Sequence, residues 1–128
     1  QAILSGNTLF ASGQIAFNPD TNELVLDNIT NETTQVMQNM KEVLVAAGMT
    51  FENVVKTSIF ISDMNDFGAI NAVYGSYFNE ATAPARETVQ VACLPKNAQA
   101  INYTRCCTLA LYLRRHQEIC LFLLAHFL

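Results

Sequence analysis

The sequence predicts an α+β domain in which a mixed β-sheet carries two helices on one face. Runs with the periodicity of strands alternate with runs of helical periodicity, in the order strand, strand, helix, strand, helix, strand. A chain of 128 residues suits one domain with enough mass to bury an ordinary core. Hydrophobic residues make up 51% and charged residues 14%, which is typical of a globular chain and not of a disordered one.

The N-terminal part of the chain reads as strand from residue 3 to residue 17. Gly6 and Asn7 form a turn signal, so Ala2–Ser5 is expected to be the first arm of a hairpin and residues 9–17 its main strand. Gly13 inside this run indicates either a bulge or a place where another group approaches the backbone closely. A turn at residues 18–22 then leads to a short strand around residues 24–26.

Two amphipathic helices follow, separated by a strong strand at residues 53–62. The first is expected to begin at an N-cap Thr30, with Glu32 complementing the helix dipole, and to end at Gly48. Its apolar positions are Val36, Met40, Val43, Leu44 and Ala47. Asn65 or Asp66 is expected to cap the second helix. The apolar stripe of that helix is Phe67, Ile70, Val73, Tyr74, Tyr77 and Phe78.

Helices on one side leave the other face of the sheet bare. Since the strands carry apolar residues on that face too, we expect self-association to cover it.

Arg86 stands after a proline-containing turn, at the start of the last predicted strand, which Pro95 ends. Strand alternation places Thr88, Gln90 and Ala92 on one face and Val89, Val91 and Cys93 on the other, where Cys93 reads as core. A rigid strand behind Arg86 would leave its five-donor fork free, which suits bidentate capture of a carboxylate. The alternative is a solvated or ion-paired surface arginine.

Charge and cysteine usage exclude several classes of function. The net charge of −4 argues against a nucleic-acid surface, which needs a basic stripe. The cysteines show no Cys-x-x-Cys spacing and no histidine at ligand distance, so neither a zinc site nor a disulfide framework is expected. Buried or incidental thiols in a reducing compartment are the favoured interpretation. The four are Cys93, Cys106, Cys107 and Cys120.

The C-terminal part reads as strand or helix through residues 109–113. Residues 119–128 are strongly apolar but too short to span a bilayer, and a membrane-surface segment is the alternative. His116 and His126 show no partner pattern and are interpreted as incidental.

Several motifs stand in a fixed order along the first three quarters of the chain. They are Ser12-Gly13-Gln14-Ile15, Asn53-Val54-Val55-Lys56-Thr57, Asp63-Met64-Asn65-Asp66-Phe67, Asn71-Ala72-Val73-Tyr74 and Pro84-Ala85-Arg86 with Val91-Ala92-Cys93-Leu94-Pro95-Lys96. In their order and separations these motifs resemble the RidA/YjgF family of enamine/imine deaminases. The resemblance covers residues 1 to about 98 and divides the chain into a RidA-like domain at residues 1–98 and an atypical tail at residues 99–128.

The resemblance implies a chorismate-mutase-like protomer that forms a homotrimer with clefts between subunits, without a metal or an organic cofactor. It implies hydrolysis of enamines and imines such as 2-aminoacrylate to 2-keto acids and ammonia, in the cytoplasm or the mitochondrial matrix. The expected enzyme is a 2-iminobutanoate/2-iminopropanoate deaminase. The alternatives are a non-catalytic trimeric binder of small carboxylates and, more remotely, a ribonuclease or translation inhibitor. Neither a nucleic-acid partner nor a transmembrane segment is expected.

By the same resemblance, Arg86 would clamp the substrate carboxylate and would be the catalytic residue. Backbone amides near Gly13 and Thr88 would bind the substrate or its water, and Asn71 matches a polar position of the family cleft. Thr88 stands where the family often has cysteine, so no thiol role is expected there. Tyr74 on the same helix is interpreted as a packing residue.

Two departures from the family pattern bear on activity. The family's Gly-Pro-Tyr-Ser lead, whose tyrosine reaches the cleft, does not precede Gln1. Ile101 falls where the family carries a glutamate that activates water or shuttles a proton, and the next later carboxylate is Glu118. The abrupt loss of pattern favours an end that is out of frame or derived from an intron. The missing acid favours the non-catalytic binder for this chain, while imine hydrolysis stays the first hypothesis.

Overall fold

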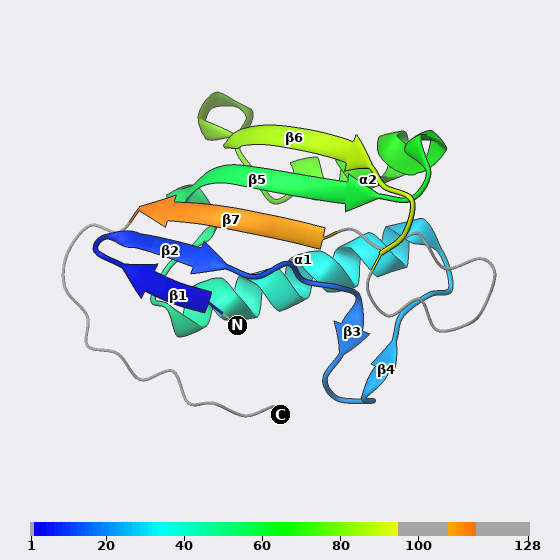
Figure 1. Ribbon diagram of the computed structural model, residues 1–128, viewed down its shortest axis with the longest axis horizontal. Coiled ribbons are helices and arrows are strands. Elements are labelled where there is room, and N and C mark those ends of the chain that lie inside the picture. The colour runs from blue at the N-terminus through cyan, green and yellow to red at the C-terminus, as the bar shows by residue number, and fades with distance from the viewer. Residues whose placement is uncertain (1, 95–107, 115–128) are drawn as a thin grey trace.

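The computed structural model describes residues 2–94 and 108–114, and its centre is a five-stranded mixed sheet (Figure 1). The order across the sheet is β1-β2-β7-β5-β6. β5 and β6 run parallel, whereas the other three neighbouring pairs are antiparallel. The strands are β1 (Ala2–Ser5), β2 (Thr8–Ala11), β5 (Val54–Ile61), β6 (Ala85–Gln90) and β7 (Thr108–Arg114).

Two helices and a small hairpin complete the described structure. The helices are α1 (Ile29–Ala46) and α2 (Phe67–Gly75). The hairpin pairs β3 (Phe17–Asn18) with β4 (Glu23–Leu24). Single 3₁₀ turns at η1 (Phe51–Asn53), η2 (Met64–Asp66) and η3 (Glu80–Thr82) lead into β5, α2 and β6. No helix in the described ranges is both long and apolar enough to cross a membrane.

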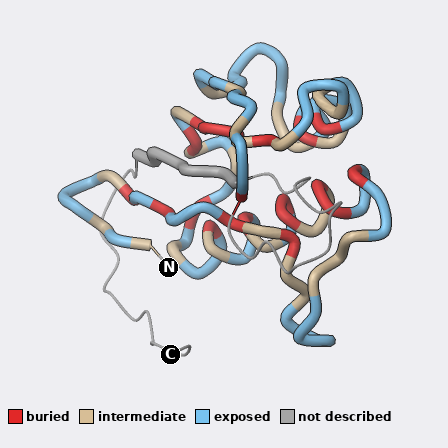
Figure 2. Tube along the Cα trace, turned by 45° about the vertical axis from the view of Figure 1, so that its right-hand side comes forward, coloured by how far each residue is buried: buried red, intermediate tan, exposed pale blue. Residues whose placement is uncertain are grey.

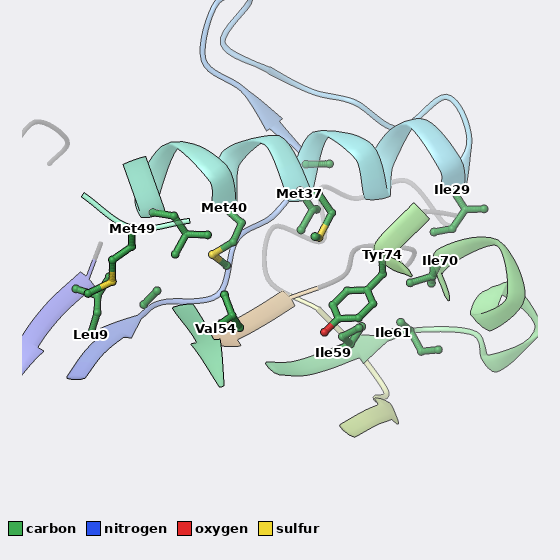
Figure 3. Close-up of a cluster of buried hydrophobic side chains, with 14 residues drawn as sticks. Leu9, Ile29, Met37, Met40, Met49, Val54, Ile59, Ile61, Ile70 and Tyr74 are labelled. Atoms are coloured by element: carbon green, nitrogen blue, oxygen red, sulfur yellow. The ribbon is translucent and has the colours of Figure 1, made fainter. Parts of the chain in front are cut away.

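The core lies between the helices and one face of the sheet, as the burial colours of Figure 2 indicate. Figure 3 shows Met37 and Met40 of α1 and Ile70 of α2 pointing toward β5, where Val54, Ile59 and Ile61 are also buried. Both helices therefore cover the same face. The two-layer α+β architecture with a mixed sheet is confirmed.

The opposite face of the sheet is exposed in the protomer. On β1 and β2, Leu4 and Leu9 pack toward the core, whereas the paired residues Ile3 and Phe10 are 72% and 42% exposed. Val89 on β6 is likewise exposed. The expected bare apolar face therefore exists.

The long N-terminal strand was predicted beyond its actual end. β2 ends at Ala11, and residues 12–16 are not strand. The side-chain amide of Asn39 on α1 donates to the backbone carbonyls of Ile15 (2.9 Å) and Phe17 (2.7 Å), groups that a continued ladder would use. Gly13 thus lies outside any strand, and its interpretation as a bulge was wrong.

The ends of α1 correct one prediction and confirm another. Asn28, not Thr30, is the N-cap, because its side chain accepts a hydrogen bond from the backbone of Asn31 at 2.9 Å. Gly48 follows the helix with φ +67°. The amides of Gly48 and Met49 donate to the carbonyls of Val45 and Leu44, which is a Schellman ending.

The second helix and the last predicted strand are both shorter than expected. Asp63 caps η2 by accepting from the amide of Asn65, and Asp66 precedes α2 without a side-chain capping bond. β6 ends at Gln90, so Cys93 lies beyond it and is exposed; its prediction as a core residue was wrong.

The C-terminal part contributes β7, which confirms the strand alternative for residues 109–113. β7 lies in the middle of the sheet between β2 and β5. The predictions for Pro95, Ile101, Glu118, His116 and His126 concern residues outside the described ranges. The domain boundary at residue 98 stays a prediction.

Candidate functional site

Arg86 is the second residue of β6, directly after the turn that Pro84 shapes. In the parallel register of β5 and β6 it stands opposite Thr57. Because alternate residues of a strand point to opposite faces, Arg86 shares the helix-covered face with Thr88 and Gln90. The arginine is exposed at this edge of the sheet.

One face of α2 meets the guanidinium of Arg86. Phe67, Asn71 and Tyr74 are spaced i, i+4 and i+7, so their side chains share that face. Nη1 of Arg86 donates a hydrogen bond to Oδ1 of Asn71. Cζ of Arg86 lies 5.6 Å from the centroid of the Phe67 ring and 5.1 Å from that of Tyr74, within range of cation–π attraction. The guanidinium is thus held by two rings and a neutral amide.

Tyr74 links this cluster to the core. Its ring packs at 4.7 Å from that of Phe78, and its hydroxyl lies 2.9 Å from Oγ1 of Thr57. Figure 3 shows Tyr74 pointing from α2 toward β5, beside Ile59. Both partners of the hydrogen bond are buried. Tyr74 is a packing residue, as expected, and it also contacts Arg86.

The neighbouring acid, Glu87, is engaged on the opposite face of the sheet. It accepts a hydrogen bond from Oγ of Ser58 and lies 3.4 Å from Nζ of Lys56. The Ser58 hydrogen bond, followed by the charge of Lys56, lowers the pKa of Glu87 below its ordinary value of 4.5. This carboxylate therefore stays ionised and is directed away from Arg86.

The rest of β6 is fixed at its far end. Oε1 of Gln90 accepts from the amide of Met64 at 3.0 Å, which ties the strand to the turn before α2. Between Arg86 and Gln90, Oγ1 of Thr88 is buried, and among the described residues it has no hydrogen-bond partner. The ligand role of the Thr88 backbone stays a prediction.

Gly13 is not brought to Arg86 within one protomer. Pairing places Ala11, Leu111, Thr57 and Arg86 in a single row across four strands. Three strand spacings separate Ala11 from Arg86 by roughly 14 Å, and Gly13 lies two residues further along.

The sequence analysis missed Phe67 and Thr57 as neighbours of the arginine. The sequence did contain a signal for Phe67, because its spacing places it on the same helical face as Asn71 and Tyr74. Thr57 could not be found in this way because its role depends on strand register. In the described part of the chain, no group of three His, Cys, Asp or Glu side chains could hold a metal ion.

Comparison with known proteins gives consistent matches. The family model described as Endoribonuclease L-PSP matches residues 1–100. A RutC family protein of Synechocystis sp. is 52% identical over 98 residues, covering 76% of this chain and 75% of that protein. Human 2-iminobutanoate/2-iminopropanoate deaminase is 43% identical over 99 residues, covering 77% and 72%. The crystal structure of E. coli TdcF with bound serine superposes with a TM-score of 0.78 at 34% identity, covering 91% and 87% of the two chains.

Proposed function

This chain belongs to the endoribonuclease L-PSP family, the RidA/YjgF family that its motifs resemble, and we propose that it hydrolyses reactive enamines and imines of the 2-aminoacrylate type to 2-keto acids and ammonia. The observation that carries the proposal is that, among the described residues, the exposed guanidinium of Arg86 contacts a neutral amide and not a carboxylate. Its hydrogen-bond partner in the described structure is the amide of Asn71, while Glu87 binds Lys56 on the other face. The rest of the guanidinium fork can therefore receive a substrate carboxylate.

The proposed reaction needs three things from the site: binding of a carboxylate, addition of water to the imine carbon and transfer of a proton to the nitrogen. Arg86 would hold the carboxylate of a 2-imino acid and fix the position of the C=N bond. Water adds to the imine carbon, a proton reaches the nitrogen, and the C–N bond breaks to release ammonia and leave the keto group. Backbone amides at Gly13 and Thr88 would hydrogen-bond the substrate or the attacking water. The proposal needs no metal or organic cofactor.

A homotrimer with clefts between subunits is part of this proposal. In one protomer Gly13 follows β2, and the end of β2 lies three strand spacings away from Arg86. A neighbouring subunit that packs at the β6 edge of the sheet, where Arg86 is exposed, would bring its Gly13 to this arginine. Ultracentrifugation of the full chain tests this, with a single species of three protomer masses expected and a monomer contradicting it.

Catalysis is tested with the imine generated in place. A coupled assay in which an amino-acid oxidase releases 2-iminobutanoate should show faster ammonia release with the wild-type chain. The Arg86→Ala variant should lose this acceleration while keeping its circular-dichroism spectrum and unfolding midpoint. Unchanged turnover in that variant would contradict the assignment of Arg86 as the catalytic clamp.

A carboxylate binder without turnover is the second candidate, and the composition of β7 favours it. Thr108–Arg114 contains no Asp or Glu, and the acid next to Arg86 is engaged elsewhere. Serine bound to TdcF is itself a small carboxylate. Calorimetric binding of 2-ketobutyrate without accelerated imine hydrolysis would favour this candidate over the enzyme.

Ribonuclease or translation-inhibitor activity comes third, since a net charge of −4 opposes RNA binding. Degradation of single-stranded RNA by highly purified protein, lost in Arg86→Ala, would support it. For location we propose a reducing compartment, either the cytoplasm or the mitochondrial matrix.

A further inference from the structure

A chain of contacts leads from the buried centre of the sheet to the guanidinium of Arg86. Thr57 lies on β5 directly opposite Arg86 and is fully buried. Its hydroxyl meets that of Tyr74 at 2.9 Å, and the Tyr74 ring lies 5.1 Å from Cζ of Arg86. The same arginine donates to Asn71, one helical turn before Tyr74. Four side chains thus form one connected cluster between β5, β6 and α2.

We propose that Thr57 and Tyr74 are positioning residues whose buried hydrogen bond sets the orientation of the Arg86 guanidinium. A tyrosine ring can tilt about its Cα–Cβ and Cβ–Cγ bonds, and only one tilt presents its face to the cation. The hydrogen bond to Thr57 selects that tilt because a buried hydroxyl without a partner is unfavourable. This inference rests on the proposed function, in which Arg86 binds a substrate carboxylate.

The arrangement explains why a threonine occupies this buried position on the core side of β5. Thr57 lies between the buried residues Val54 and Ile59, where valine has nearly the same shape and no polar group to satisfy. A hydroxyl there is favourable only with a partner, and Tyr74 supplies it. The pair therefore does more than fill the core: it connects the rigid sheet to an exposed cation, whose other contacts in the described structure are the Asn71 amide and the Phe67 ring.

The first test compares Thr57→Val with Thr57→Ser by calorimetry with 2-ketobutyrate. Valine keeps the shape but removes the hydroxyl, whereas serine keeps the hydroxyl. We expect Thr57→Val to weaken binding about two- to fivefold, the range of a lost cation–π contact at an exposed site, and Thr57→Ser to restore most of it. Tyr74→Phe, which keeps the ring, should weaken binding by a similar factor. Wild-type affinity in both Thr57→Val and Tyr74→Phe would overturn the proposal.

A matched control separates positioning from loss of stability. Thr33 is equally buried, but its hydroxyl donates to the carbonyl of Ile29 within α1. Thr33→Val should lower stability without changing the affinity of the folded protein. A loss of affinity in Thr33→Val as large as in Thr57→Val would show a merely structural effect and overturn the proposal.

A second readout needs no ligand and therefore separates this inference from the proposed function. The Nε–H resonance of Arg86, assigned by its disappearance in Arg86→Lys, should carry a ring-current shift from Tyr74. We expect Thr57→Val to move it and Thr57→Ser to return it toward the wild-type position. If wild-type protein fails to bind 2-ketobutyrate, carboxylate capture is wrong, yet the resonance still decides the orientation. An unmoved resonance in Thr57→Val would overturn the inference whatever the affinity.

Discussion

Thr57 and Arg86 stand opposite each other on neighbouring parallel strands, and both side chains reach the same face of α2. The hydroxyl is buried and the guanidinium is exposed, so the pair marks the place where the core opens to the edge of the sheet. In the proposed function, Arg86 binds a carboxylate at this edge, and the neighbouring acid Glu87 does not compete because it pairs with Lys56 and Ser58.

Arg86→Lys should weaken binding of 2-ketobutyrate at least tenfold although the positive charge is kept. Lysine offers a point charge in place of a planar fork and cannot make the two parallel hydrogen bonds of a bidentate pair. Calorimetry measures the affinity. The matched control is Lys56→Arg, which exchanges the same two residue types on the opposite face and should leave binding unchanged. Equal affinity of Arg86→Lys and wild type would exclude bidentate capture.

Asn71→Asp should weaken the same binding about three- to tenfold at neutral pH. The introduced carboxylate would face Nη1 of Arg86 and compete with the carboxylate of the ligand. Because Asn71→Ala removes the amide without adding charge, it should have the smaller effect. Affinity measured from neutral to acidic pH should recover in Asn71→Asp as the new group is protonated. A flat profile would count against competition.

Glu87→Gln should flatten the acid side of the stability profile. The Ser58 hydrogen bond and the Lys56 charge lower the pKa of Glu87 in the folded protein. The stabilisation is therefore complete above the ordinary pKa of 4.5 and is lost as the pH falls through the lowered value. Urea unfolding midpoints of wild type and Glu87→Gln, measured from neutral to acidic pH, detect this loss of stability. Glu42→Gln changes an exposed acid of α1 and serves as the control. If Glu87→Gln loses stability with falling pH as much as wild type does, the contacts of Glu87 with Ser58 and Lys56 do not stabilise the folded protein.

Gly48→Ala should lower the free energy of unfolding by about 1–2 kcal/mol. At φ +67° an added Cβ is strained, and the Schellman ending of α1 depends on this conformation. Gly75→Ala in α2 offers a control of opposite sign. An added Cβ there meets nothing within 4 Å, so higher helix propensity should make it neutral or stabilising. Chemical denaturation compares the two, and equal effects would argue against the glycine ending.

Asn28→Ala should cost about 1 kcal/mol of stability, because the substitution removes the side chain that accepts a hydrogen bond from the amide of Asn31. Thr30→Ala should cost much less, since Thr30 already lies inside the helix and is exposed. The same denaturation experiment measures both. The opposite ranking would restore the assignment that the sequence favoured.

The sequence by itself determined the features that depend on neighbours close along the chain: which segments are helix or strand, and which residues share a face. The periodicity of α1 places Val36, Met40 and Leu44 in the core, and the β-branched run gives β5. Helical spacing puts Asn71 and Tyr74 on one face, and the proline turn predicts that Arg86 begins a strand. Each of these follows from local sterics and from the burial of one side of an element.

Only the tertiary structure decided which elements meet. It places β7 between β2 and β5, and it ends β2 early because Asn39 binds carbonyls 22 and 24 residues away in sequence. It also sets Thr57 against Tyr74 and directs Glu87 away from Arg86. Register and long-range hydrogen bonds depend on partners distant in sequence, which no local pattern specifies. That is why Arg86, Asn71 and Tyr74 could be found from the sequence, whereas the contact of Thr57 with Tyr74 and the orientation of Glu87 could not.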